Sequence, residues 1–123
     1  GRNRGGLTAR RTYRVEFETA SFTVAGERGD FAPEGYFGGQ PGALFECTIT
    51  DVNGKLKRLP SKGATEILHR GDRVSINPAG GGGYGDPAQR DRAALIADVL
   101  DGYVSREAAD RLYGVSDLST GTA

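Results

Sequence analysis

The sequence lacks the residue types on which several kinds of site depend. It has no tryptophan, no methionine, one cysteine and one histidine in 123 residues. Cys47 cannot form a disulfide within the chain, and with His69 alone it cannot complete a structural zinc site. A single histidine also leaves no Ser–His–Asp set of any specificity. We therefore expect no catalytic residue and no metal ligand set in this chain.

Long hydrophobic runs are missing as well. No stretch approaches the roughly 18 apolar residues that a membrane span needs. A signal peptide has an apolar run after its basic start, and no such run follows the arginine-rich start of this sequence. These absences predict a cytoplasmic protein with no membrane partner.

Net charge is zero, with 16 basic and 16 acidic side chains, but the charges are unevenly placed. Residues 1–14 contain five arginines and no acid, whereas residues 83–123 hold seven acids and four arginines. Such an arginine arm can bind a carboxylate or phosphate, or it can simply be solvated. Basic residues elsewhere are neither clustered nor interleaved with aromatic ones, so we expect no nucleic-acid partner.

Alternation of apolar and polar residues predicts about six short antiparallel strands before residue 78. In the first, Tyr13, Val15 and Phe17 share one half-buried face, and the same period continues at Phe22 and Val24. A second run, over 45–49, turns Cys47 inward as a small buried hydrophobe.

Two turns complete the expected strand pairs. Asn53-Gly54 suits a type I′ turn into a strand at 55–59, because both residues tolerate positive φ. The turn at Gly71-Asp72 is expected to join strands around Ile67-Leu68 and 74–76 as a hairpin.

Two short helices follow the strands in the predicted fold. Asp91 can cap the first, which presents Leu95, Val99 and Tyr103 as a stripe at helical spacing. Ser105 can cap the second, and Gly114 can end it. The sequence thus predicts an α+β fold, with a single domain over residues 1–115 and a polar tail over 116–123.

Twenty glycines, about 16% of the chain, are gathered in clusters. The cluster at 80–83 lies between a strand and a helix, but no second parallel strand or Gly-Lys-Ser/Thr follows it, which excludes a dinucleotide fold and a P-loop. Three roles remain open: close packing against another chain, contact with an anion or substrate, and a plain turn. In the cluster at 35–42, Tyr36 and Phe37 either cover the local core or anchor a partner. Lys62, in a proline-stiffened turn, is a further candidate for neutralising an anion.

Taken in order, several segments resemble the C-terminal region of the hydantoinase B family. The segments are Gly1-Arg2-Asn3-Arg4-Gly5-Gly6, Gly35-Tyr36-Phe37-Gly38-Gly39-Gln40-Pro41-Gly42, Leu59-Pro60-Ser61-Lys62, Gly71-Asp72-Arg73-Val74, Gly80-Gly81-Gly82-Gly83-Tyr84-Gly85-Asp86-Pro87, Asp101-Gly102-Tyr103-Val104-Ser105-Arg106-Glu107-Ala108-Ala109 and Tyr113-Gly114-Val115. That family includes B-type subunits of ATP-dependent hydantoinases, 5-oxoprolinases and ketone carboxylases. As a separate short chain, the sequence is similar to the small subunit of acetophenone carboxylase, and a cut fragment is the other explanation.

The resemblance implies a division of labour. A-type partner subunits use ATP and Mg²⁺ to phosphorylate the substrate, and a large B-type partner, which can hold a divalent metal, completes ring opening or carboxylation. This chain would complete the B-type subunit of a ketone carboxylase, or else of a cyclic-amide hydrolase, and would bind no cofactor itself. An independent, non-enzymatic binding module is the competing hypothesis.

The resemblance also suggests where this chain would act. Candidate anion contacts are Arg2, Arg4, Lys62, Gly81, Gly82 and Gly83. Candidate interface residues are Tyr36, Phe37 and Tyr84.

Overall fold

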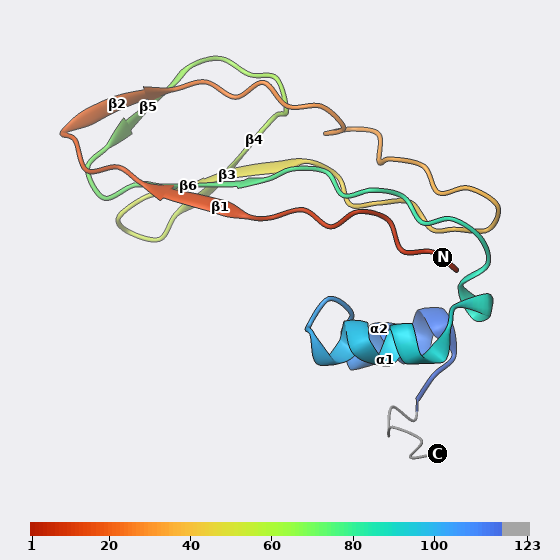
Figure 1. Cartoon of the computed structure of the whole chain (residues 1–123). Coiled ribbons are helices and arrows are strands. Elements are labelled where there is room, and N and C mark those ends of the chain that lie inside the picture. The colour runs from red at the N-terminus through yellow and green to blue at the C-terminus, as the bar shows by residue number, and fades with distance from the viewer. Residues whose placement is uncertain (117–123) are drawn as a thin grey trace.

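The computed structural model describes residues 1–116, in which six strands precede two α-helices (Figure 1). The strands are β1 (Arg11–Arg14), β2 (Thr19–Phe22), β3 (Glu46–Thr50), β4 (Leu56–Leu59), β5 (Glu66–His69) and β6 (Arg73–Asn77); a 3₁₀ turn η1 (Pro87–Gln89) leads to α1 (Arg92–Leu100) and α2 (Arg106–Tyr113). This arrangement confirms the α+β prediction. Apart from Ser116, the expected polar tail lies outside the described residues.

The strands form two antiparallel sheets that enclose one core. Four strands pair in the order β1-β6-β3-β4, and β2 pairs with β5. Cys47 lies opposite Ile76, and Ile49 lies opposite Val74, so these side chains share one face of the larger sheet. Leu68 of β5 belongs to the same cluster. Cys47 is fully buried, as expected for a small hydrophobe in this core.

The two sheets are linked by one long antiparallel ribbon. Residues 1–26 run beside residues 61–85, from the Asn3–Tyr84 bridge through β1–β6 and β2–β5 to the Ala25–Lys62 bridge. The ribbon bends at 15–18 and 70–72, where its strands pass from one sheet to the other. Bends of this kind are how strands switch sheets at the corner of a sandwich.

This bend overturns two expectations about pairing and burial. β5 and β6 follow one another across Gly71 but do not pair, since each continues the ribbon in a different sheet. Tyr13 and Phe17 were expected on a half-buried face, yet they are 54% and 75% exposed. The cause is that β1 is an edge strand ending at Arg14, and the chain turns away before Phe17 reaches the core.

The hairpin between β3 and β4 forms as expected, but its turn is different. Gly54 has a left-handed φ of 82°, whereas Asn53 does not, so the turn is not type I′. The Gly54 N–H donates to the Asp51 carbonyl, and the Asp51 carboxylate accepts from the N–H groups of Asn53 and Lys55. The side chain of Asp51 thus stabilises a longer loop.

Both predicted helix starts are confirmed. Asp91 accepts a hydrogen bond from the Ala94 N–H, and Ser105 accepts one from the Ala108 N–H. Gly114 ends α2 with a left-handed φ of 68°. Tyr103 was expected on the inward stripe, but α1 ends before it and its side chain is 55% exposed.

Candidate functional site

The glycine run is the centre of a stack of extended backbones. Residues 80–85 lie between the N-terminal segment 1–6 and the segment 36–43. This region is at the end of the larger sheet that is nearer to the helices (Figure 1). On one side, the Gly81 N–H donates to the Gly6 carbonyl. On the other, the N–H groups of Gly80 and Gly83 donate to the carbonyls of Ala43 and Gln40. We call residues 1–6, 33–43 and 80–85 the glycine stack.

The stack requires glycine because its backbones are too close for side chains. A Cβ on Gly82 would lie 1.8 Å from the Glu34 carbonyl oxygen, and one on Gly39 would lie 2.1 Å from the Gly83 carbonyl oxygen. These are backbone atoms that cannot move aside alone. The sequence left close packing against another chain as one of three roles for this cluster. These distances describe close packing, but against backbone of this same chain.

An ion cluster built on one buried aspartate joins the glycine stack to the helix pair. Asp98 of α1 is 7% exposed and accepts hydrogen bonds from Arg4, with Nε 3.0 Å from Oδ2 and Nη2 3.3 Å from Oδ1. Arg90 binds the same carboxylate through Nη2, and its Nη1 donates to the Arg2 carbonyl. Each guanidinium also lies near an aromatic ring: Arg4 is 5.3 Å from the centroid of Tyr103, and Arg90 is 5.8 Å from that of Tyr113.

Three of the predicted anion contacts line one hollow. Arg4, Gly81 and Gly83 surround a space of about 330 Å³ between the glycine stack and α2, with Leu112 and Tyr113 on the helix side. The Arg4 guanidinium is already held by Asp98, and the N–H groups of Gly81 and Gly83 already donate to backbone carbonyls. The guanidinium and N–H groups that line this hollow therefore already have hydrogen-bond partners within the chain.

Two other predicted anion contacts, Arg2 and Lys62, lie apart from the hollow. Arg2 is exposed, and its side chain makes no hydrogen bond or ion pair with any residue in 1–116. Lys62 lies beside β2 and β5 and pairs with Glu27, Nζ to Oε1 at 2.8 Å. That hydrogen bond raises the pKa of Lys62 and lowers the pKa of Glu27. Lys62 therefore does not join the same group of residues as Arg4.

The three predicted interface aromatics are brought together at the tip of the stack. Phe37 and Tyr84 have ring centroids 5.1 Å apart, and Tyr36 forms a bridge to Tyr84. Exposed fractions are 61% for Tyr36, 78% for Phe37 and 55% for Tyr84. Tyr36 and Phe37 therefore have surface open to a partner, which is the second of the two roles that the sequence left open for them. Phe37 also has a φ of 51°, a strained conformation for a bulky residue.

Residues 1–116 do not form a metal-binding group. In that range no set of three or more His, Cys, Asp or Glu side chains could hold a metal ion. Burial raises the pKa of the Cys47 thiol, which makes it a poor nucleophile. No helix in the described part of the chain is long and apolar enough to cross a membrane.

The part of the chain that contains the glycine stack and both sheets is similar to known proteins. The family model described as hydantoinase B/oxoprolinase matches residues 1–87. The chain belongs to this family. Its matched range contains both sheets and the whole glycine stack.

Individual members of the family extend the match into the helices. The putative B-type subunit of a D-/L-hydantoinase from Pseudomonas sp. (strain NS671) is 34% identical over 94% of this chain and 20% of its own length. The crystal structure of an ATP-dependent caprolactamase from Pseudomonas jessenii is 30% identical, with a TM-score of 0.79 over 95% of this chain and 21% of that one. An acetone carboxylase structure, at 22% identity and a TM-score of 0.56 over 65% of this chain and 15% of that one, shares the fold. The chain thus spans about a fifth of the length of the curated relatives it matches.

Asp98 and Arg90 are the site residues that sequence reasoning missed. They lie far from Arg4 in the chain, and Asp98 is 94 positions from it. An acid on the apolar side of α1, next to Leu95, is the one local signal that could have indicated a buried partner.

Proposed function

We propose that this chain is the C-terminal part of a B-type subunit in an ATP-dependent enzyme that opens cyclic amides. In this proposal, A-type partners use ATP and Mg²⁺ to phosphorylate the amide oxygen, and the larger part of the B-type subunit completes ring opening. Any divalent metal is held by that larger part, since residues 1–116 offer no ligand group of three or more. The enzyme works in the cytoplasm.

The observation that carries the subunit assignment is the amount of exposed surface. The chain has 8448 Å² of accessible surface, whereas a folded monomer of 13.0 kDa exposes about 6,300 Å². Residues 117–123 account for at most about 1,000 Å² of the excess, at the unfolded-chain value of about 1.45 Å² per dalton. More than about 1,000 Å² remains, which exceeds one partner's share of a standard protein interface, about 800 Å².

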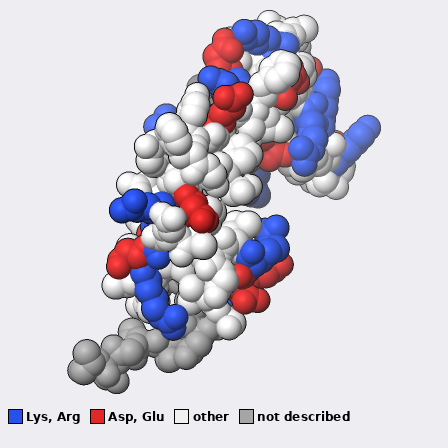
Figure 2. Space-filling view, turned by 90° about the vertical axis from the view of Figure 1, so that its right-hand side faces the viewer, with Lys and Arg blue, Asp and Glu red and all other residues white. Residues whose placement is uncertain are grey.

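Much of this surface is apolar. Within residues 1–116, fourteen large hydrophobic side chains are exposed by 39% or more, among them Phe17, Phe31 and Phe37 at 75% or above. Figure 2 shows one face on which uncharged residues predominate between scattered charged side chains. A small domain that acted alone would be prone to associate through such a surface. This argues against an independent binding module.

Within the assembly, we assign this chain a positioning role. The glycine stack is rigid because its backbones touch, and the Arg4–Asp98–Arg90 cluster fixes the helix pair against it. This rigid end presents the exposed side chain of Arg2 and the rings of Tyr36, Phe37 and Tyr84. Arg2 is the candidate for holding a carboxylate or phosphate, and the three aromatic residues contact the larger part of the subunit.

Cyclic amides are preferred as the substrate class because of the relatives' names. Hydantoinase and caprolactamase, whose names denote cyclic amides, are matched over nearly the whole chain. A ketone carboxylase of the acetophenone type is the second candidate. It is favoured by the fold shared with acetone carboxylase, which covers less of the chain.

The first test is native mass spectrometry of the untagged protein purified from its source cells. Recovery within an assembly that contains much longer A-type and B-type chains is expected. Recovery at the mass of the chain alone, 13.0 kDa, would overturn the proposal.

The purified assembly then separates the two substrate classes. ATP consumption that depends on hydantoin or caprolactam is the expected result, whereas dependence on a ketone with bicarbonate would establish the second candidate instead. Arg2→Ala should raise KM or lower kcat without changing assembly, and Lys62→Ala is its control because Lys62 lies in the other sheet layer. If the two variants changed KM and kcat equally, Arg2 would have no specific role in holding the substrate.

A further inference from the structure

The outer edge of β1 is an open hydrogen-bonding edge. β1 is the first strand in the order β1-β6-β3-β4, and all four of its residues are exposed. The Val15 N–H donates to the Asp72 carbonyl at 2.9 Å, which marks Val15 and Asp72 as a hydrogen-bonded pair. Such pairs alternate along an antiparallel ladder, so the N–H groups of Thr12 and Arg14 point away from β6.

The side chains agree with this assignment. Thr12 lies opposite Ser75, and their hydroxyl oxygens are 2.8 Å apart. Side chains approach most closely at the non-hydrogen-bonded pairs of an antiparallel ladder. The main-chain groups of Thr12 are therefore available to a further strand.

An apolar hollow and unneutralised charge lie along the same edge. Leu7, Tyr13 and Ile76 line a hollow of about 440 Å³ together with Arg11. Leu7 and Tyr13 are each 54% exposed. The side chain of Arg11 makes no hydrogen bond or ion pair with another residue in the described range 1–116. Backbone, apolar and charged groups thus occur together on one side of β1.

The opposite edge of the sheet, β4, differs in its charges. Lys57 pairs with Glu66 at 2.8 Å, and Arg58 pairs with Glu46 at 2.7 Å. Charged side chains that are already neutralised protect an edge without attracting an acidic partner. β1 is therefore the edge suited to a ligand strand.

We infer that β1 accepts an extended, acidic strand from the larger part of the B-type subunit, which adds to the sheet as a fifth strand. Main-chain hydrogen bonds to Thr12 and Arg14 would supply affinity, and a carboxylate on Arg11 with apolar side chains over Tyr13 would supply specificity. The relatives are about five times as long as this chain, so most of a B-type polypeptide lies outside it. The inference rests on the proposed function.

Hydrogen exchange measured residue by residue tests this directly. In the intact assembly, compared with the chain alone, exchange at the Thr12 and Arg14 amides should slow by at least about a hundredfold. The outward amides of β4, at Leu56 and Arg58, should not change. An assembly in which Thr12 and Arg14 exchange as fast as in the free chain would overturn this inference and leave the proposed function standing. A chain found in no assembly would overturn both.

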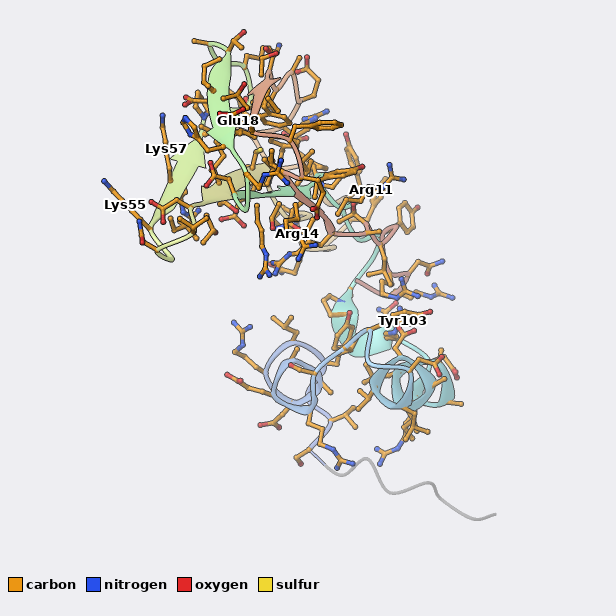
Figure 3. The ribbon with its side chains drawn as sticks, turned by 90° about the vertical axis from the view of Figure 1, so that its left-hand side faces the viewer. Arg11, Arg14, Glu18, Lys55, Lys57 and Tyr103 are labelled. Atoms are coloured by element: carbon orange, nitrogen blue, oxygen red, sulfur yellow. The ribbon has the colours of Figure 1, made fainter. Side chains whose placement is uncertain are left out.

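Charge reversal gives a second test that does not alter the strand backbone. Arg11→Glu should weaken association about tenfold, whereas Lys55→Glu, the same change at the far side of the sheet, should not (Figure 3). Thr12→Pro should also weaken association, because proline removes the outward N–H while β1 keeps its bonds to β6. Thr12→Val is its control, since it loses the hydroxyl but keeps the amide. Equal effects within either pair would contradict strand addition.

Discussion

Arg4 and Asp98 join the two ends of the fold, with Nε 3.0 Å from Oδ2, although they are 94 positions apart in the sequence. Arg90 shares the same carboxylate, so one buried acid is bound by two guanidinium groups. Figure 3 shows Tyr103, whose ring lies beside Arg4, at the junction of the strand region and the helices. One charged side chain, that of Asp98, thus bonds α1 to Arg4 of the glycine stack and to Arg90 ahead of the helix.

Removing that charge should detach the helix pair. We expect Asp98→Ala to lower the free energy of unfolding by about 3–5 kcal/mol, because two partly buried arginines lose their counter-charge. Urea unfolding followed by far-UV circular dichroism measures it. Asp101→Ala, which removes an exposed acid after the same helix, should stay within about 0.5 kcal/mol of the wild type. A loss of less than about 1 kcal/mol for Asp98→Ala would show that the ion cluster does not hold the helices.

The close packing of the glycine stack can be tested by comparing the stability of two glycine variants. Gly82→Ala should cost at least about 3 kcal/mol or prevent soluble expression, since the added methyl would overlap the Glu34 carbonyl. Gly6→Ala adds the same methyl where no atom lies within 4 Å, and should be neutral or stabilise by up to about 1 kcal/mol. Thermal unfolding of both variants checks this. Similar losses for the two would mean that the stack is not closely packed.

Local features of the fold could be predicted from the sequence, and distant pairings could not. Asp91, Ser105 and Gly114 act within one helical turn, so their roles are readable from neighbouring residues. The pairing of β5 with β2 instead of β6 depends on a bend that involves two segments far apart in the chain. No pattern within either segment specifies that bend.

In the candidate site, too, local features could be predicted from the sequence and distant contacts could not. The glycine cluster at 80–83 is recognisable as a place of close approach, but the sequence left its role open, and its neighbours come from two other parts of the same chain, residues 1–6 and 33–43. Arg4 stands out as a binding residue because it belongs to an arginine arm without acids. Its acid, Asp98, is supplied by a helix at the other end of the sequence.

Cys47 should make stability fall at alkaline pH. Burial raises the pKa of its thiol in the folded protein, so the unfolded chain loses this proton first as pH rises. Between the two pKa values the native state binds more protons, and the free energy of unfolding therefore decreases with pH. The Cys47→Ala variant is less stable because it leaves a cavity, but its stability no longer depends on the titration of a thiol. The difference between wild type and Cys47→Ala, measured by urea unfolding from pH 7 to 10, should shrink as pH rises above about 8.5. A constant difference would contradict a raised pKa.

Phe37 and Phe31 provide a matched pair for locating the interface at the aromatic tip. Both are 78% exposed, but Phe37 packs on Tyr84 at the tip of the glycine stack, whereas Phe31 lines a hollow near Lys62. Neither change should alter the stability of the isolated chain by more than about 1 kcal/mol, because neither ring is buried. Exposed aromatic residues that become buried on association are frequent hot spots, worth about 2 kcal/mol or more. Phe37→Ala should therefore weaken assembly at least tenfold and Phe31→Ala should not, as measured by titrating the variants into the remaining subunits. The reverse order would move the interface to the Lys62 side of the molecule.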